Sequence, residues 1–256
     1  MHTEIPLINI LWTGGWDSTY RVLHLSRMNV ILQPHYIICD NRRSIKFELE
    51  AINKITDDIL NDTRTQCVFK TTIITHEKDI PPDEEIANAF RSIRQSVLIG
   101  PQYDYLSRYA KTVGNLEIGI EKGGLAEDMM NKFGKLTYVE NNGLSYWELD
   151  KSASSAALFK VFGYFRFPIY TLSKLNMKAE AEKLRVMDIM EKTWFCHFPH
   201  SGLPCGCCFP CKFTIEDGLD YRLPKQALRR YSVEKKFGKH KLYQLIKRFR
   251  RKLLNY

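Results

Sequence analysis

The chain has 256 residues, of which 44% are hydrophobic and 26% charged, and its formal net charge is +9 at pH 7. This length allows one substantial hydrophobic core and a small appendage. No apolar run approaches the roughly 20 residues that span a bilayer, and no apolar secretory segment is present. We therefore expect a soluble, cytoplasmic protein with no transmembrane segment.

The most informative segment comes first in the chain. Residues 7 to 19 read LINILWTGGWDST and predict an apolar strand, a glycine turn and the start of a helix. Adjacent glycines let the backbone approach a ligand closely, and a helix N-terminus favours an anion. The alternative is an ordinary tight turn capped by Asp17 or Ser18. We predict a phosphate-binding loop, without the Gly-Lys-Ser/Thr of Walker-type loops. Its predicted nucleotide contacts are Trp12, Thr13, Gly14, Gly15, Asp17, Ser18 and Thr19.

Beyond this loop the apolar pattern alternates between strand and helix. The predicted elements are a strand at 35–39, a helix at 45–59, a β-rich run at 67–75, helical patterning through 93–97 and at 103–109, and a strand at 116–120. Such alternation predicts a doubly wound, Rossmann-like parallel α/β sheet. Ligands lie beyond the carboxyl ends of such strands, so Asp40 and Glu121 are expected to converge with the glycine loop on one cleft. Residues 138–165 show no clear periodicity.

A third segment, residues 167–180, reads FPIYTLSKLNMKAE. It predicts a strand at FPIY, a turn and a helix beginning near Ser173, with Lys174 and Lys178 one turn apart on the same face. Two lysines at a helix start oppose the helix dipole. We expect an anion nearby, and the alternative is a pair of solvated surface lysines.

Five of the seven cysteines lie within sixteen residues. Four of them fit the pattern Cys-x8-Cys-x2-Cys-x2-Cys, which predicts a closed, structural zinc site and leaves Cys207 over. An iron–sulfur cluster is the main alternative, and His197 or His200 is an alternative ligand. The odd cysteine count argues against disulfides. The predicted ligands are Cys196, Cys205, Cys208 and Cys211.

The positive charge is concentrated at the C-terminus. From Arg222 to Tyr256 there are thirteen Lys or Arg against one acidic residue, Glu234, so the preceding 221 residues total −3. Apolar residues at helical spacing predict a basic amphipathic helix. It either packs on its own domain or binds nucleic acid, an acidic protein or an anionic membrane. Its apolar positions are Leu242, Leu245, Ile246, Phe249 and Leu253. The predicted domains are 1–190 for the nucleotide, 191–220 for the zinc knuckle and 221–256 for the basic helical tail.

The segments TGGWDS, IYTLSKLNMKAE and CHFPHSGLPCGCCFPC stand in the order found in the 7-cyano-7-deazaguanine synthase (QueC) family of N-type ATP pyrophosphatases, also called PP-loop enzymes. The chain resembles this family over roughly residues 5–220. It departs from it at Thr13, where the family has serine, and at residues 99–102, where IGPQ replaces a Gly-Arg-Asn-like segment. The resemblance implies an adenine nucleotide alpha hydrolase-like fold. A homodimer is one expected assembly of the chain.

The resemblance also implies a reaction. ATP, with Mg²⁺, would activate the carboxylate of 7-carboxy-7-deazaguanine as an adenylate, and a nitrogen nucleophile would then displace AMP. With ammonia the product is an amide, which a second round converts to the nitrile. Asp17, Ser18 and Lys178 are the expected catalytic residues, and Glu121 and Asp128 the expected contacts to the guanine-like edge.

Three alternatives to nitrile synthesis remain. Relatives of this family in CBASS-type antiphage operons join the deazaguanine to a protein amine. The divergence and the basic tail of this chain make that conjugating variant nearly as strong a candidate as nitrile synthesis. PP-loop enzymes that thiolate tRNA also combine ATP, cysteines and basic surfaces. A non-enzymatic scaffold that binds nucleic acid through its tail is the last alternative.

Overall fold

The computed structural model describes residues 4–40, 42–141 and 143–238. The chain divides into two compact units, Met1–Trp194 and Phe195–Tyr256. Within the described residues, no helix combines the length and the apolar character that crossing a membrane requires.

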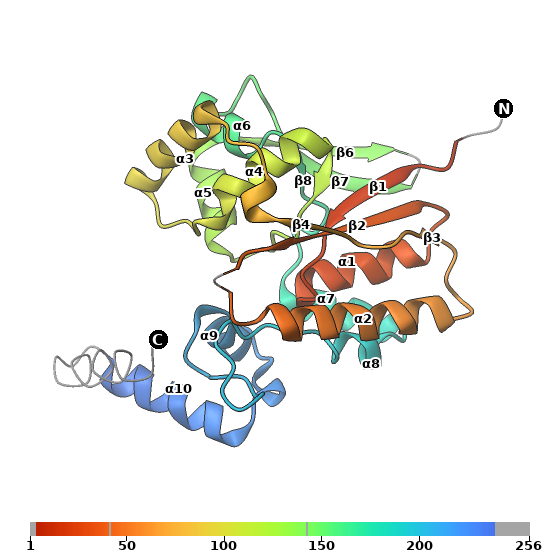
Figure 1. The fold of residues 1–256 in the computed structure, drawn as a ribbon, viewed down its shortest axis with the longest axis vertical. Helices are drawn as coiled ribbons and strands as arrows, with labels where there is room; N and C mark the ends of the chain where they lie inside the picture. Colours follow the sequence, from red (N-terminus) through yellow and green to blue (C-terminus); the bar gives the residue numbers. More distant parts are fainter. Residues whose placement is uncertain (1–3, 41, 142, 239–256) are drawn as a thin grey trace. The chain divides into compact units, whose positions relative to one another are not determined.

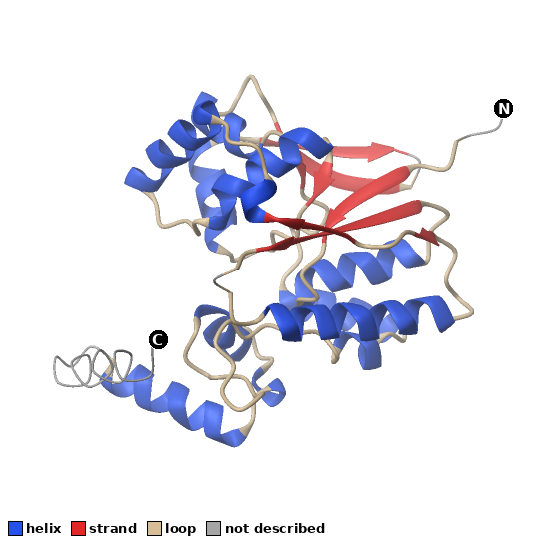
Figure 2. Cartoon of the chain, viewed as in Figure 1, coloured by secondary structure: helices blue, strands red, loops and turns tan. Residues whose placement is uncertain are grey.

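The first unit is built on a parallel sheet (Figures 1 and 2). The strands lie in the order β3 (Val68–Phe69), β2 (Ile31–Ile38), β1 (Leu7–Leu11), β5 (Leu116–Glu117) and β8 (Phe165–Arg166), and β4 (Ile73–His76) also pairs with β2. In register, Leu7 aligns with Ile31 and Ile10 aligns with Glu117. The chain leaves β1 toward β2 on one side, whereas β5 lies on the other. The crevice beyond the carboxyl ends of β1 and β5 is therefore the topological switch point of the sheet.

Helices cover both faces of this sheet (Figure 1). One layer holds α1 (Trp16–Ser26), α2 (Ile45–Asn61), α7 (Lys174–Lys183) and α8 (Met187–Met190). The other holds α3 (Glu84–Ser96), α4 (Gln102–Val113), α5 (Leu125–Phe133) and α6 (Ala156–Phe162), and a 3-10 turn, η1 (Glu77–Asp79), precedes α3. This arrangement confirms the predicted doubly wound α/β fold.

The apolar periodicity explains how these helices attach to the sheet. In α2 the predicted apolar stripe is buried at Ile52, Ile55 and Ile59, and burial of an aliphatic side chain contributes about 1.5–3 kcal/mol. On the other face, Phe162 of α6 and Phe165 of β8 belong to one core cluster with aliphatic residues from α3, α4 and α5. Each helix layer thus packs through a stripe that the sequence already marks.

The predicted strand at residues 167–170 is wrong by two residues. The strand β8 is Phe165–Arg166, and residues 168–170 form a turn. Phe167 makes a single antiparallel bridge, in which its amide donates to the Trp147 carbonyl at 2.8 Å and its carbonyl accepts from the Trp147 amide at 3.1 Å. Pro168 has no N–H and so cannot extend the ladder. The bridge joins the sheet to an antiparallel hairpin, β6 (Leu136–Asn141) and β7 (Leu144–Leu149), in the region without clear periodicity.

The second unit contains the cysteine-bearing loop, α9 (Phe209–Glu216), a 3-10 turn η2 (Asp220–Arg222) and α10 (Lys225–Phe237). Gly206 in the loop has φ +77°, and a Cβ there would lie 2.1 Å from the Ala227 carbonyl oxygen of α10. Arg230 of α10 donates through Nε to the Cys205 carbonyl at 2.8 Å. The loop and α10 therefore pack as one body. The predicted amphipathic helix with Leu242 to Leu253 lies outside the described residues.

Candidate functional site

The glycine loop between β1 and α1 is shaped by its neighbours. Gly14 has φ +67°, a left-handed conformation that favours glycine, and a Cβ there would lie 3.0 Å from the Glu48 carbonyl oxygen and 3.2 Å from Ile52 Cγ1. The Gly14 carbonyl accepts a hydrogen bond from the Trp194 amide at 2.8 Å. The loop is thus held between α2 and the end of the first unit, and a side chain at position 14 would push its neighbours in α2 by a few tenths of an ångström.

The start of α1 carries a buried hydroxyl. Ser18 is 7% exposed, and its Oγ has no hydrogen-bond partner among the described residues. A buried polar atom left unpaired costs roughly 1–3 kcal/mol, and such an atom in a native structure needs an explanation. Gly15 is the N-cap of α1 and supplies no side-chain cap, and the N-terminus of a helix favours an anion. An anionic ligand at this helix end would satisfy both features.

A cavity of about 180 Å³ lies at this point of the first unit. Apolar residues from three strands or their extensions, Leu11, Ile37 and Ile118, form part of its wall. The helix α4 contributes Tyr103 and Tyr105. Burial raises the pKa of Tyr105 to about 12, so this hydroxyl stays protonated at neutral pH and remains a hydrogen-bond donor. The other lining residues are Thr13, Gly15, Asp17, Ser18, Arg42, Gln102, Leu106 and Gly119.

The segment after β5 runs against the start of α1. A Cβ at Gly119 would lie 3.2 Å from the Ser18 amide nitrogen and 3.3 Å from Asp17 Cβ. Contacts of this length are tighter than ordinary van der Waals contacts, so a larger residue at 119 would displace the α1 N-terminus. The segment after β5 therefore packs against the first turn of α1 at the switch point.

A lysine from α7 joins two carboxylates beside the cavity. Lys174 Nζ lies 2.7 Å from Glu121 Oε1 and 3.7 Å from Asp17 Oδ1, and the lysine side chain is 11% exposed. The helix α7 begins at a capping box formed by Ser173 and Asn176. These carboxylates supply the anion that we expected near the lysine pair. Lys178 is half-buried one turn later and is not among the residues that line the cavity.

A second cation is fixed at the cavity by a buried acid. Glu48 in α2 is 5% exposed and accepts hydrogen bonds from Tyr36 Oη at 2.7 Å and Ser44 Oγ at 2.6 Å. Arg42 Nη1 donates to the same carboxylate at 3.3 Å. Three donors compensate the buried charge. Arg42, which lines the cavity, is thereby held in place.

Several predicted contacts lie elsewhere. Trp12 is fully buried, and its Nε1 donates to Thr19 Oγ1 at 2.9 Å, so this pair braces the strand against α1. Asp40 is exposed, and its Oδ1 lies 3.5 Å from His76 Nδ1. Asp128 is exposed on the first turn of α5. The structure thus brings Thr13, Gly15, Asp17 and Ser18 to the cavity and links Glu121 to them through Lys174.

Sequence reasoning missed Arg42, Tyr103, Tyr105 and Gly119 as parts of the site. Arg42 follows β2 by only four residues, so the same rule about strand ends that selected Asp40 could have selected it. The tyrosines on α4 carry no such signal, because their place at the cavity depends on how the helix crosses the sheet.

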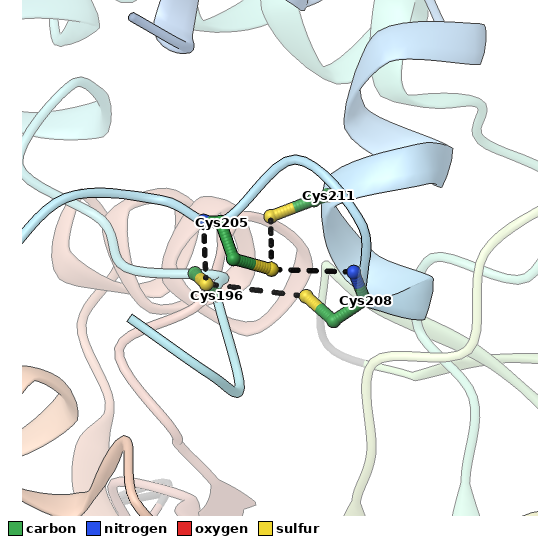
Figure 3. Close-up of side chains that lie close together, drawn as sticks. All are labelled: Cys196, Cys205, Cys208 and Cys211. Carbon is green, nitrogen blue, oxygen red and sulfur yellow. Dashed lines mark hydrogen bonds between the residues drawn. The ribbon is translucent and has the colours of Figure 1, made fainter. Parts of the chain in front are cut away.

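The predicted cysteine ligands meet in the second unit (Figure 3). One ligand atom from each of Cys196, Cys205, Cys208 and Cys211 lies within 4.8 Å of the other three, and the Cys205–Cys211 and Cys196–Cys208 sulfur pairs are each 3.9 Å apart. Four sulfurs at about 2.3 Å from one tetrahedral ion stand about 3.8 Å apart. The cluster therefore fits a single metal ion.

Backbone amides add to this fit. The Cys205 amide donates to Cys196 Sγ at 3.2 Å, and the amides of Cys207 and Cys208 donate to Cys205 Sγ at 3.3 Å each. Hydrogen bonds to sulfur favour the thiolate, which is the form that binds metal. With four protein ligands the site is closed, as structural sites are.

Comparison with known proteins identifies no family for this chain. No family model and no curated protein matches the sequence. Among solved structures, the chain is similar to the U34-tRNA thiolase NcsA from Methanococcus maripaludis with its [4Fe-4S] cluster, at 16% sequence identity and a TM-score of 0.44 over 93% of this chain and 74% of that chain. The assignment of the fold as a doubly wound parallel α/β sheet rests on the strand order and register of the chain itself.

Proposed function

We propose that this chain is a PP-loop enzyme that cleaves ATP to AMP and pyrophosphate. The observation that carries the proposal is the buried Ser18 hydroxyl, which has no hydrogen-bond partner within the described part of the chain. It lies at the N-terminus of α1, after a glycine loop at the switch point of the sheet. The motif TGGWDS supplies the resemblance, and the geometry supplies a reason for phosphate to bind there.

The residues of the cavity have distinct proposed roles. The first-turn N–H groups of α1 and the hydroxyls of Thr13 and Ser18 would bind phosphate oxygens and stabilise the charge of the departing pyrophosphate. Asp17 is the carboxylate on the cavity wall suited to hold Mg²⁺, which prefers oxygen ligands and would neutralise phosphate charge when bound. Lys174, held 3.7 Å from Asp17, would orient that carboxylate. We assign this supporting role to Lys174, and Lys178 keeps the catalytic role that the sequence resemblance gives it.

We propose the carboxylate of 7-carboxy-7-deazaguanine as the group activated. A carboxylate oxygen attacks the α-phosphorus, the bond between the α-phosphorus and its bridging oxygen breaks, and pyrophosphate leaves. A nitrogen nucleophile then attacks the carbonyl carbon of the adenylate, loses a proton and expels AMP. The tyrosines of α4 suit a planar base, and the fixed guanidinium of Arg42 suits an anionic group. Glu121 remains the better candidate for the guanine-like edge, because Asp128 is exposed on α5.

The final acceptor separates two versions of this reaction. Ammonia gives the amide and, after a second round, the nitrile. A protein amine gives a conjugate, as in the antiphage variant.

We propose zinc as the metal of the second unit. In an iron–sulfur cluster of the cubane type each cysteine binds a different iron, so the ligand sulfurs stand a cluster's width apart. Sulfurs that lie within 4.8 Å of one another favour one shared ion. This spacing also counts against a cluster-dependent tRNA thiolase, which is the second candidate function.

The test is to supply ATP and 7-carboxy-7-deazaguanine, with and without ammonium, and to follow AMP, pyrophosphate and the mass of the product. We expect AMP formation that depends on the carboxylate. Asp40→Asn is a control, because Asp40 is an exposed aspartate paired with His76, whereas Asp17→Asn should abolish AMP formation. Conversion to the mass of the nitrile identifies ammonia as the acceptor, whereas a reaction that stalls at the amide or the adenylate points to a macromolecular amine as the true acceptor. No carboxylate-dependent AMP would contradict the substrate assignment.

A further inference from the structure

The second unit carries a row of cations that the proposed chemistry does not use. On α10, Lys225, Arg229 and Lys236 are all exposed. They are four and seven residues apart, which places them on one face of the helix. At 1.5 Å of rise per residue the row extends over roughly 16 Å. This length suits an extended polyanion better than a single small anion.

The opposite face of α10 is occupied within its own unit. Ala227 is fully buried, and its carbonyl oxygen is where a Cβ on Gly206 would clash. Tyr231 is buried to 9% exposure, and its hydroxyl donates to Glu216 Oε1 at 2.7 Å. A helix that binds a membrane needs its apolar face for lipid. Here Ala227 and Tyr231 pack inside the unit, and the exposed apolar residues of α10 are Val233 and Phe237. The cationic row lies on the side of the helix opposite Ala227 and Tyr231.

The knuckle fixes the orientation of this row. Arg230 donates to the carbonyls of Cys205 at 2.8 Å and Pro204 at 3.3 Å, and Lys212 Nζ lies 3.0 Å from Glu234 Oε1. Glu234 is the only acidic residue of α10, and its ion pair with Lys212 connects α10 to the knuckle. Beyond α10, the sequence from Lys239 to Tyr256 adds seven Lys or Arg and no acidic residue.

We propose that the face of α10 formed by Lys225, Arg229 and Lys236 binds the phosphate backbone of a nucleic acid. Interfaces with nucleic acid are much more positive than interfaces between proteins, whose cores are depleted in lysine. Backbone binding of this kind carries no sequence preference of its own. The proposal is independent of the ATP chemistry of the first unit.

The test uses the full chain and a fluorescent 20-nucleotide single-stranded RNA, with binding followed by anisotropy as salt is varied. Each phosphate contact contributes about −0.7 to the slope of log K against log salt for single strands. Replacing the three residues together (Lys225→Gln, Arg229→Gln, Lys236→Gln) should make the slope less negative by roughly 2, with a similar loss for unrelated RNA sequences.

A matched triple variant in the first unit, Lys54→Gln, Lys70→Gln and Lys135→Gln, removes the same charge from three exposed lysines and should leave the slope unchanged. Zinc content and melting temperature of both variants show whether they fold. An unchanged slope in the folded α10 variant would overturn the proposal. So would binding by the parent to vesicles of anionic lipid in place of RNA, or no RNA binding at low salt. AMP formation, measured on the same samples, reports separately on the proposed enzyme.

Discussion

The two units build their sites in opposite ways. In the first unit, the cavity gathers residues from the loop after β1, from Arg42, from α4 and from the segment after β5, which only the strand order brings together. In the second, the four sulfurs come from sixteen consecutive residues. The first site therefore depends on a hydrophobic core, and the second, with the zinc that we propose, would depend on a metal ion. The two sites should fail under different perturbations.

Removal of metal should produce the largest effect. Cys208→Ser should release zinc and unfold the second unit, because binding of a structural zinc contributes on the order of 10 kcal/mol to folding in small domains. Metal analysis and calorimetry should show lost zinc and a lost or lowered transition, while the core transition of the first unit remains. Cys207→Ser is the control, since Cys207 lies outside the set of four ligands. Zinc retained at parental content in Cys208→Ser would contradict the ligand assignment.

A substitution in the glycine loop should break the first site without metal loss. Gly14→Ala places a Cβ 3.0 Å from the Glu48 carbonyl at φ +67°, so we expect a stability cost of about 1–3 kcal/mol and loss of AMP formation by about 100-fold or more. Gly114→Ala is the matched control, because φ is +72° there and nothing lies within 4 Å. This variant also places an alanine at positive φ, and it should keep activity. Equal activity in the two variants would remove the loop from the mechanism.

Arg42 offers a finer test of how the cavity recognises its ligand. Arg42→Gln removes the guanidinium while Glu48 keeps its bonds from Tyr36 and Ser44. A lost hydrogen bond to a charged group costs about 1.5–3 kcal/mol, so KM for the carboxylate substrate should rise roughly 10- to 100-fold. Lys46→Gln, at a lysine with an 80% exposed side chain, should leave KM unchanged. An effect on kcat alone would argue that Arg42 does not bind the ligand.

The smallest effect concerns pH and the core of the first unit. Burial lowers the pKa of His35 to about 4, and its ring is bonded to Tyr109 Oη at 2.8 Å and Asn9 Oδ1 at 3.0 Å. Since the unfolded histidine titrates near 6.5, stability is lost as pH falls from about 6.5 toward 4. The loss amounts to at most about 2 kcal/mol at pH 5.

Urea denaturation at pH 7 and pH 5 measures this loss. The difference in unfolding free energy should shrink in His35→Gln. An equal difference in parent and variant would show that His35 does not titrate in this way.

The fold was predictable where one periodic signal was enough. The stripe of α2 and the unit formed by β1, the loop and α1 follow directly from the residues 7–19 and 45–59. The strand β8 was misplaced because FPIY is apolar, yet Pro168 ends the ladder. The hairpin β6–β7 was not predicted, because its exposed face carries Tyr138 and apolar and polar residues alternate only weakly along its strands.

The candidate sites were likewise predictable only where their residues lie close together in the sequence. The cysteine ligands could be found from spacing, since a metal knuckle is local in sequence. The sequence marked Lys174 as one of two lysines at a helix start. Its partners Asp17 and Glu121 could not be predicted, because they depend on where α7 lies in the fold. The position of Tyr105 at the cavity could not be predicted, because no local sequence pattern indicates which turn of α4 faces the end of β1.

Cleavage of ATP at the glycine loop is tested by the product formed from ATP labelled at the α-phosphate, compared between the parent and Asp17→Asn with 7-carboxy-7-deazaguanine present. We expect labelled AMP with equimolar pyrophosphate from the parent and none from the variant, at unchanged zinc content and melting temperature. Labelled ADP, or AMP formed equally by both proteins, would contradict cleavage at this loop.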